Sequence, residues 1–424
     1  MATPELLPLF DTIAQCNRCG FCQAGCPVFR VTGEEHSLAR GRQSIARALI
    51  LGNMELSPEV IGALEDCLLC RGCTAHCFPG IKTDEIVTAI RHAYIKRHGQ
   101  PAWRRILFGK VLSSSKRLQM VGRMALWAKR HGLGVAAEKL GLSALTGGRV
   151  GVANQVLPPM QASAFQRGKT PIPEPAKVLY SVGYFVSCGL SFQYPEVVEA
   201  TLRVLARSGC KITVMDNTCC GRPAQAYGDL DAARDIARKN IDRMAEALAL
   251  DAVISECGSC STFLKEYQEL LKDDPSYAPK AEALSKKVRS FSEFLVAVDA
   301  PMGLNALSGT VTYHDPCHLS NRFGKITAQP RQLLKAVPGM TYKELPEADW
   351  CCGAAGSFTF MHHTEAKGVL ERKMANVEKT GAHTLATECP ACMMHLDFGV
   401  RSQGLPVRVR HLSQILDEAH GAVD

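Results

Sequence analysis

Apolar and polar positions in the C-terminal part of the chain alternate between two periods. Short apolar, β-branched runs predict buried strands, and they are separated by stretches in which apolar residues recur at helical spacing. Residues 195–207 show this helical spacing, with Val197, Val198, Leu202 and Leu205 on one side. The predicted strands cover residues 177–185, 211–215, 251–255, 309–313 and 384–387, and the predicted helices cover 195–207, 229–248, 330–337 and 364–380. Strands that alternate with helices predict parallel sheets covered by helices.

The N-terminal part has a different pattern, because residues 41–51 and 58–64 are helical in period and no strand-like run accompanies them. The sequence therefore predicts an α+β protein overall. An all-α domain at 1–98 is followed by a basic helical connector at 99–175, of which 157–175 is a linker rich in Pro, Gly and Gln. Two α/β units are expected at 176–300 and 301–424.

Cysteine is the residue that changes this picture most, since the 424-residue chain contains 19 of them. Disulfide-dense proteins are usually small and secreted, whereas this chain is large, and its N-terminus has no secretory pattern. No apolar stretch approaches the ~18 residues of a membrane-spanning helix. We therefore expect a cytoplasmic protein whose cysteines bind metal.

Eight cysteines form two tight runs near the N-terminus, each with the spacing C-x2-C-x2-C-x3-C that bacterial ferredoxins use for [4Fe-4S] clusters. In this pattern three cysteines bind one cluster and the fourth binds the neighbouring cluster. The predicted ligands are Cys16, Cys19, Cys22 and Cys77 for cluster 1, and Cys67, Cys70, Cys73 and Cys26 for cluster 2. Two zinc sites are the alternative, although zinc sites usually use separated C-x2-C pairs.

Ten further cysteines form an internal repeat. The first unit contains Cys188, Cys219, Cys220, Cys257 and Cys260, and the second contains Cys317, Cys351, Cys352, Cys389 and Cys392. Their patterns, C-x30-CC-x36-C-x2-C and C-x33-CC-x36-C-x2-C, share a gap of 36 residues, which indicates duplication. All ten follow predicted strands, where ligands of parallel α/β sheets collect. We expect one or two further iron–sulfur clusters here, with zinc sites or redox-active Cys-Cys disulfides as alternatives.

Three residues near these motifs are not expected to bind a cluster. His318 and His395 could serve as ligands or proton donors, but we interpret them as helix-end residues beside a cluster. Cys210 matches no motif position and is interpreted as a buried thiol without a role in binding.

Several motifs together resemble one protein family. They are Cys-Gly-Phe-Cys at 19–22, Ser-x2-Arg-Gly-Arg at 37–42, Phe-Pro-Gly-Ile-Lys at 78–82, the two Cys-Cys-Gly motifs, and Glu266-Tyr267. Over nearly the whole chain the sequence is similar to the iron–sulfur subunit of glycolate oxidase, to related D-lactate dehydrogenase proteins, and to the related component of membrane-bound heterodisulfide reductase. The complete C-x2-C pairs are typical of heterodisulfide reductases, which bind noncubane clusters there.

The resemblance implies an electron-transfer subunit of a flavin-dependent glycolate or D-lactate dehydrogenase. We find no flavin or nicotinamide fingerprint, so we expect no flavin on this chain and an FAD-containing dehydrogenase subunit as partner. Electrons would pass to a quinone, a membrane cytochrome or another carrier. Two alternatives stay open: a catalytic subunit that cleaves a disulfide, as in heterodisulfide reductase, and a subunit of a membrane redox complex.

Charge adds one further feature, because residues 86–137 contain Lys and Arg but no Asp or Glu. Such a basic amphipathic segment suits anionic lipid at the inner face of the cytoplasmic membrane, or an acidic partner. The alternative is a solvated pair of helices between domains. Nucleic acid is not an expected partner, since stacking aromatics do not accompany the basic residues.

Overall fold

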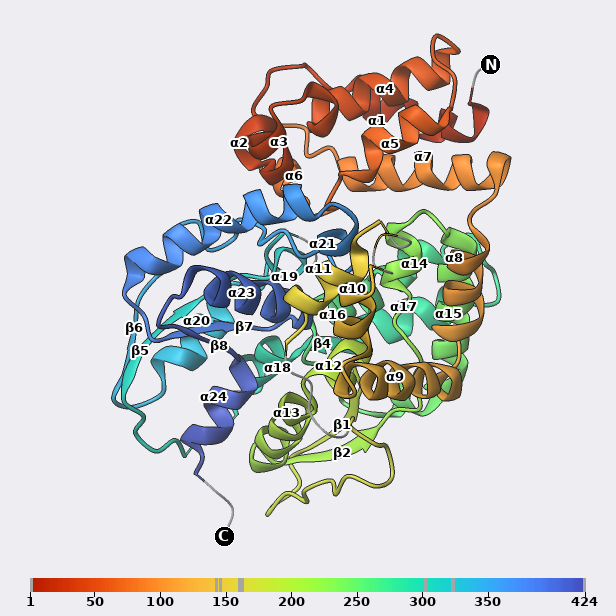
Figure 1. Ribbon diagram of the computed structural model, residues 1–424. Helices are drawn as coiled ribbons and strands as arrows, with labels where there is room; N and C mark the ends of the chain where they lie inside the picture. Colours follow the sequence, from red (N-terminus) through yellow and green to blue (C-terminus); the bar gives the residue numbers. More distant parts are fainter. Residues whose placement is uncertain are drawn as a thin grey trace.

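The computed structural model describes residues 3–141, 144, 147–158, 164–300, 303–321 and 325–421. A helical N-terminal part lies across two α/β units that stand side by side (Figure 1). The two units each contain a four-stranded parallel sheet. The predicted α+β organisation is therefore confirmed.

The N-terminal part, which we call the dicluster domain, is built from short helices around one long helix. Its elements are η1 Pro4–Leu9, α1 Phe10–Ala14, α2 Cys22–Gly25, α3 Pro27–Thr32, η2 Glu35–Ser37, α4 Ala39–Leu51, α5 Pro58–Glu65, α6 Gly72–Ala75 and α7 Thr83–His98. Leu49 on α4 packs with Ile86 and Ile90 on α7 in its core. The helices predicted at 41–51 and 58–64 are confirmed as α4 and α5.

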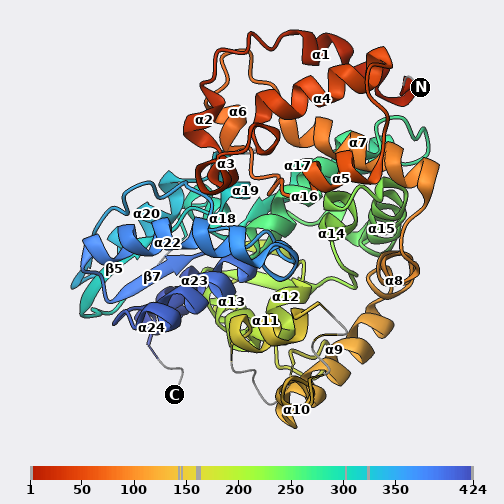
Figure 2. The ribbon, with the colours of Figure 1, turned by 45° about the horizontal axis from the view of Figure 1, so that its top comes forward.

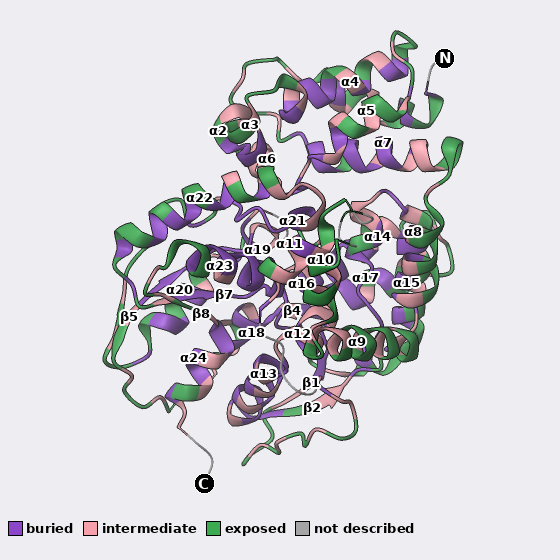
Figure 3. Cartoon of the chain, viewed as in Figure 1, coloured by how far each residue is buried: buried purple, intermediate pink, exposed green. Residues whose placement is uncertain are grey.

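The connector consists of α8 Ala102–Ile106, the π-helical turn η3 Leu107–Val111, α9 Ser115–Arg130, α10 Leu133–Lys139 and α11 Arg149–Val156. Its first part packs on the first α/β unit through the buried side chains of Phe108 and Leu112. Helix α9, in contrast, buries none of its residues (Figure 3). Of the predicted linker, residues 159–163 lie outside the described part, and Phe165 is buried in the first unit.

The first α/β unit arranges its strands in the order β2-β1-β3-β4. Its elements are β1 Tyr180–Tyr184, α12 Cys188–Gln193, α13 Pro195–Arg207, β2 Cys210–Val214, α14 Arg222–Ala226, α15 Leu230–Arg243, η5 Ala245–Ala249, β3 Ala252–Ser255, α16 Gly258–Leu270, α17 Ala278–Lys287, β4 Val288–Ser290 and α18 Phe291–Ala297. The apolar stripe predicted on residues 197–205 is the buried face of α13.

The second unit repeats this topology with the order β6-β5-β7-β8. Its elements are β5 Gly309–Tyr313, α19 Cys317–Ser320, α20 Ala328–Lys335, β6 Met340–Tyr342, α21 Phe358–Met361, α22 His363–Thr380, β7 Thr384–Thr387, α23 Pro390–Gln403, β8 Arg408–His411 and α24 Leu412–Ala419. Three strands were not predicted: β4, β6 and β8. They have only three or four residues, and β4 and β8 contain arginines, so they lack an apolar run.

The two units exchange equivalent contacts across their interface. Helix α24 of the second unit packs on α13 of the first, where Arg203 and Asp417 form an ion pair of 2.7 Å. Helix α18 of the first unit packs on α20 of the second. Figure 2 shows the dicluster domain covering one side of both units. Within the described residues, no helix has the length and apolar character needed to cross a bilayer.

Candidate iron–sulfur sites

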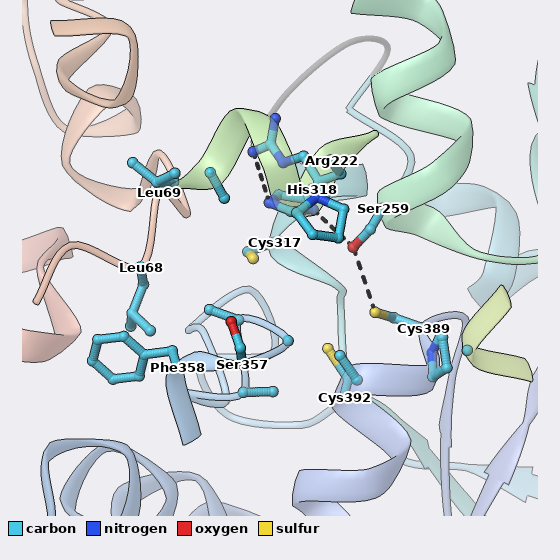
Figure 4. Close-up of a pocket in the computed structure, with 18 of the residues that line it drawn as sticks. Leu68, Leu69, Arg222, Ser259, Cys317, His318, Ser357, Phe358, Cys389 and Cys392 are labelled. Carbon is cyan, nitrogen blue, oxygen red and sulfur yellow. Dashed lines mark hydrogen bonds between the residues drawn. The ribbon is translucent and has the colours of Figure 1, made fainter. Parts of the chain in front are cut away.

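The ten cysteines of the two repeats line a single cavity of about 270 Å³. The cavity lies where the two units meet the dicluster domain, and Cys67 and Arg91 of that domain also line it. Figure 4 shows Cys317, Cys389 and Cys392 around this space, with His318 held between Arg222 and Ser259. The two five-cysteine sets, which are separate in sequence, therefore share one site.

Local structure explains why the cysteines converge. Each follows the carboxyl end of a parallel strand, although β6, the strand before Cys351 and Cys352, was not predicted, and the C-x2-C pairs start long helices. Cys257 is the N-cap of α16 and Cys389 is the N-cap of α23. Helix N-termini stabilise negative charge and so favour thiolates over thiols.

The double cysteines sit in a loop that only glycine accommodates well. Gly221 and Gly353, which follow the two Cys-Cys pairs, have φ values of +95° and +89°. Their backbone N–H groups donate to the sulfurs of Cys219 and Cys351, both at 3.5 Å. A side chain at Gly353 would also place its Cβ 2.8 Å from the carbonyl oxygen of Ala366. The Cys-Cys-Gly motif is thus one structural unit in each repeat.

Neighbouring thiols interact with one another through the whole cavity. In the first unit, contacts with Cys188 and Cys220 raise the pKa of Cys219, and contacts with Cys219 and Cys260 lower the pKa of Cys220. Between the units, contact with Cys257 is the main cause that lowers the pKa of Cys389. In the second unit, contacts with Cys317, Cys352 and then Cys70 raise the pKa of Cys351. The interactions therefore run from Cys188 to the dicluster domain.

The dicluster cysteines surround two smaller hollows. Cys16, Cys19, Cys22 and Cys77 line hollow 1, and Cys26, Cys67, Cys70 and Cys73 line hollow 2. Cys73 lines both, so the hollows adjoin. The structure brings together the two predicted sets of four, with Cys26 and Cys77 each crossing to the other run.

The two cysteine runs have the same backbone shape. In the first run Arg18 and Gly20 have φ values of +54° and +85°, and in the second run Leu69 and Arg71 have +53° and +59°. These left-handed positions occur two and four residues after the first cysteine of each run, and they are strained for Arg and Leu. Arg71 is held by ion pairs with Asp84 and Glu85, both at 2.8 Å. Strain in a repeated ligand loop is typical of a binding site.

Gly72 and Gly25 face each other at a close backbone contact. A Cβ on Gly72 would lie 2.4 Å from the carbonyl oxygen of Gly25, and a Cβ on Gly25 would lie 2.4 Å from the carbonyl oxygen of Gly72. The two glycines therefore let α2 and α6 approach each other between the hollows.

The chemistry of these sites fits iron–sulfur clusters. Many thiols that face one another in buried space cannot ionise together unless cations neutralise them. Two buried arginines provide part of this charge near Cys67: Arg42 lines hollow 2 and forms an ion pair with Asp66 at 2.7 Å, and Arg91 lines the large cavity and donates to the Cys67 carbonyl oxygen at 3.4 Å. Burial raises the pKa of Cys26 to about 11, so this thiol is expected to ionise when a metal binds it.

Comparison with known proteins matches these sites to two domain families. The cysteine-rich domain family matches residues 182–265 and 311–397, and the 4Fe-4S dicluster domain family matches residues 12–81. A probable glycolate oxidase iron–sulfur subunit from Bacillus subtilis is 32% identical over 421 residues, with 96% of this chain and 94% of that protein covered. The chain belongs to the glycolate oxidase iron–sulfur subunit family. It is therefore an iron–sulfur protein.

Other relatives of this family are shorter. Lactate utilization protein A from Halalkalibacterium halodurans is 32% identical over 238 residues, which cover 56% of this chain and 96% of that protein. The protein of the same name from Shouchella clausii is 33% identical over 239 residues. A solved structure of a hypothetical protein from Helicobacter pylori covers 100% of this chain and 78% of its own, with a TM-score of 0.50 and 10% identity, and shows a likeness of fold alone.

Of the two histidines interpreted as helix-end residues, His318 lies at the start of a short helix that lines the cavity, and His395 differs from this interpretation. His318 lies in α19 and its ring nitrogens contact Ser259 Oγ at 2.9 Å and Arg222 at 3.1 Å. His395 lies within α23 rather than at its end, and it contacts Thr359 and Ala366. Cys210 is buried in β2 and is not among the residues that line the cavity.

A third histidine at the site, His314, was not predicted from the sequence; it directly follows β5. Its side chain forms a compact group with Cys352 and Cys392, in which the ligand atoms all lie within 4.8 Å of one another. A signal for it existed, because the equivalent residue of the first repeat is Phe185. Superposing the repeats by their strand ends would have shown a histidine in place of an apolar residue.

Proposed function

We propose that this chain is the electron-transfer subunit of a flavin-dependent 2-hydroxy-acid dehydrogenase, with glycolate or D-lactate as substrate. A partner FAD subunit would oxidise the hydroxy acid and take up two electrons, and this chain would carry them onward one at a time to a quinone or another carrier. The names of the relatives support the substrate class.

The proposal assigns the cysteines to clusters. Cys16, Cys19, Cys22 and Cys77 would bind cluster 1, and Cys26, Cys67, Cys70 and Cys73 would bind cluster 2. Each five-cysteine set of the cavity would bind one further cluster. The domain division at residues 98, 175 and 300 follows from the same scheme.

The observation that carries the proposal is the continuity of the thiols. The two hollows adjoin at Cys73. The thiol of Cys70 in hollow 2 contacts that of Cys351 in the second unit, and the thiol of Cys389 in that unit contacts that of Cys257 in the first. Asn321 of the second unit also donates to the Cys70 carbonyl oxygen at 3.1 Å. Isolated structural sites would not require this arrangement, whereas an electron relay does.

Hollow 1 is the end of the relay that faces solvent. Cys19 is exposed, and two aromatic side chains flank it, Phe21 with 65% and Phe78 with 94% of its surface exposed. Exposed aromatic residues are enriched in protein interfaces. We propose that a redox partner docks here.

A second exposed surface, the outer face of α9, is proposed to contact anionic lipid. Met120, Met124 and Trp127 are exposed there, and Lys116 and Arg123 lie on the same side of the helix. Apolar and basic residues on one face, with no acidic residue from 86 to 137, suit a negatively charged bilayer surface. Membrane contact would bring the relay close to a quinone.

The test of the proposed function uses the full chain after anaerobic reconstitution. We expect iron and sulfide for at least two four-iron clusters and no oxidation of glycolate or D-lactate with an artificial dye. Added flavoprotein partner should restore turnover and reduce the clusters. Turnover by the flavin-free chain alone, or zinc in place of iron, would contradict the proposal.

For the membrane surface, Trp127→Ser with Met124→Ser should weaken binding to phosphatidylglycerol vesicles, whereas binding to phosphatidylcholine vesicles should be weak throughout.

Disulfide reduction is a second candidate, favoured by the cavity that the cysteine sets share with His318 and Arg222. A small disulfide could enter such a space, as the resemblance to heterodisulfide reductase implies. Reduced, reconstituted chain that cleaves a disulfide without partner would support this candidate, and reduced chain that only passes electrons to a quinone analogue would exclude it.

A further inference from the structure

His314 is a fully buried imidazole whose side-chain neighbour is the Cys352 thiol. Its side chain has 0% of its surface exposed, and apart from the contact with the Cys352 thiol neither ring nitrogen has a partner among the described residues. The other buried histidines of the second unit are satisfied: His395 contacts Thr359 and Ala366, and His411 contacts Ser413 and the Glu256 carbonyl oxygen. A buried polar group without a partner is costly, so its position calls for an explanation.

The position of His314 is fixed by the fold. Its backbone N–H donates to the Ala386 carbonyl oxygen at 2.9 Å, as the N–H of Phe185 does to Ile254 in the first repeat, also at 2.9 Å. The two residues are therefore structural equivalents at the ends of β1 and β5. Phe185 is buried in the apolar core of the first unit, so this position needs no polar side chain for folding.

The neighbours of His314 point to a ligand. A nitrogen of the imidazole and the sulfurs of Cys352 and Cys392 all lie within 4.8 Å of one another. The Cys352 side chain also contacts those of Cys351, Cys392 and His314. Thiolates and a neutral imidazole are established ligands of iron in iron–sulfur clusters.

From this geometry we infer that His314 coordinates iron in the second cysteine-rich unit, beside Cys352 and Cys392. This inference rests on the proposed presence of a cluster there. The first unit would bind its cluster with thiolates alone, and the second with thiolates and one imidazole. An imidazole that takes the place of one thiolate on an iron lowers the negative charge around the cluster, and such replacement raises the reduction potential. The second unit should therefore have a higher potential than its all-thiolate counterpart.

A buried positive charge in the second unit should raise the reduction potential of its cluster further. Lys373 is fully buried, and its ammonium group donates to the carbonyl oxygens of Glu347 and Ala348, the latter at 3.2 Å. In the first unit the buried residue that donates to the corresponding loop is the uncharged Asn240, whose amide contacts the Cys219 carbonyl oxygen at 2.8 Å. The imidazole of His314 and the ammonium group of Lys373 should therefore both stabilise the reduced state of the cluster in the second unit.

The test is electron spin-echo spectroscopy of reconstituted full-length protein with and without ¹⁵N-labelled histidine. We expect a directly coordinated histidine nitrogen on one cluster, and we expect it to be lost in His314→Phe, which copies the first repeat. The midpoint potential of one cluster should shift downward in this variant while the others stay. His314→Cys should keep the iron content of the wild type but lose the nitrogen coupling.

His395→Gln is the matched control, because it removes a buried histidine of the same unit whose nitrogens already have partners. It should retain the nitrogen coupling. Coupling that persists in His314→Phe, or a wild-type cluster of the second unit without histidine coupling, would overturn the inference and leave the proposed function intact. A C-terminal half that binds no iron would instead overturn the cluster assignment itself.

Discussion

One buried guanidinium links the dicluster domain to the first cysteine-rich unit, beside the contacts that His92, Lys96 and Gln100 make with that unit. Arg91 on α7 donates to the carbonyl oxygens of Leu64 and Ala226, both at 2.6 Å, and to that of Cys67 at 3.4 Å. A hydrogen bond from a charged donor contributes about 1.5–3 kcal/mol, so the two short bonds together contribute roughly 3–6 kcal/mol. Burial lowers the pKa of Arg91, which shows that part of this gain is offset by desolvation.

Arg91→Met should therefore destabilise the folded chain by about 2–4 kcal/mol, since it keeps the apolar stem and leaves three carbonyl groups without their donor. For a dicluster domain (residues 1–98) that unfolds as one unit, where each kcal/mol lowers Tm by roughly 4–8 °C, the expected decrease in Tm is on the order of 10 °C. Thermal scans at one fixed rate, followed by the visible absorbance of the clusters, measure it.

Lys96→Met is the matched control for Arg91→Met. Lys96 lies further along the same helix and pairs with Asp231 at 2.7 Å, but more than half of each side chain is exposed. Exposed ion pairs contribute about 0–1 kcal/mol, so the control should lower Tm by no more than a few degrees. Equal shifts in the two variants would refute the reasoning that the buried guanidinium stabilises the fold more than an exposed ion pair does.

The remaining predictions concern individual side chains at and near the sites. Cys26→Ser should alter the paramagnetic signal of cluster 2 and spare cluster 1, because Cys26 lines hollow 2; the opposite result would exclude the crossing of the fourth ligand. Cys352→Ser should remove more iron than Cys220→Ser, because Cys352 lies beside His314, and equal losses would remove this asymmetry. Burial lowers the pKa of His411 to about 4, so the unfolded chain binds the additional proton between pH 4 and 6.5 and stability should decrease as pH falls through this window, by about 3 kcal/mol in total. His411→Gln should flatten the dependence of Tm on pH, and an unchanged slope would contradict this.

Most of the fold could be predicted from the sequence because its main elements carry strong periodic patterns. The strands at 309–313 and 384–387 and the helix at 195–207 have the predicted bounds. The helix predicted at 229–248 ends earlier, at Arg243, and continues as the 3-10 turn η5. The short strands β4 and β8 are formed by pairing with β3 and β7, and such pairing leaves no apolar run in three or four residues.

The candidate site could be predicted only in part, for a related reason. Cysteine spacing indicates which thiols act together inside one repeat, but not that the two repeats face each other. That arrangement depends on contacts such as the one between Gly258 N–H and the Glu388 carbonyl oxygen, at 2.8 Å, where a Cβ on Gly258 would meet Leu319 at 2.8 Å. A single shared cavity is therefore a property of tertiary packing.

The order of the sites along the proposed relay gives the second unit a central position. It meets the dicluster domain through Cys351 and Cys70, and it meets the first unit through Cys389 and Cys257. A defect in the second unit should therefore interrupt transfer between the other sites, whereas a defect in the first unit should remove only the end of the thiol chain. The unit that lies between the others is also the one with His314 and the buried Lys373. Both groups favour electrons there, so the position where the path can be interrupted is also the position where electrons should reside.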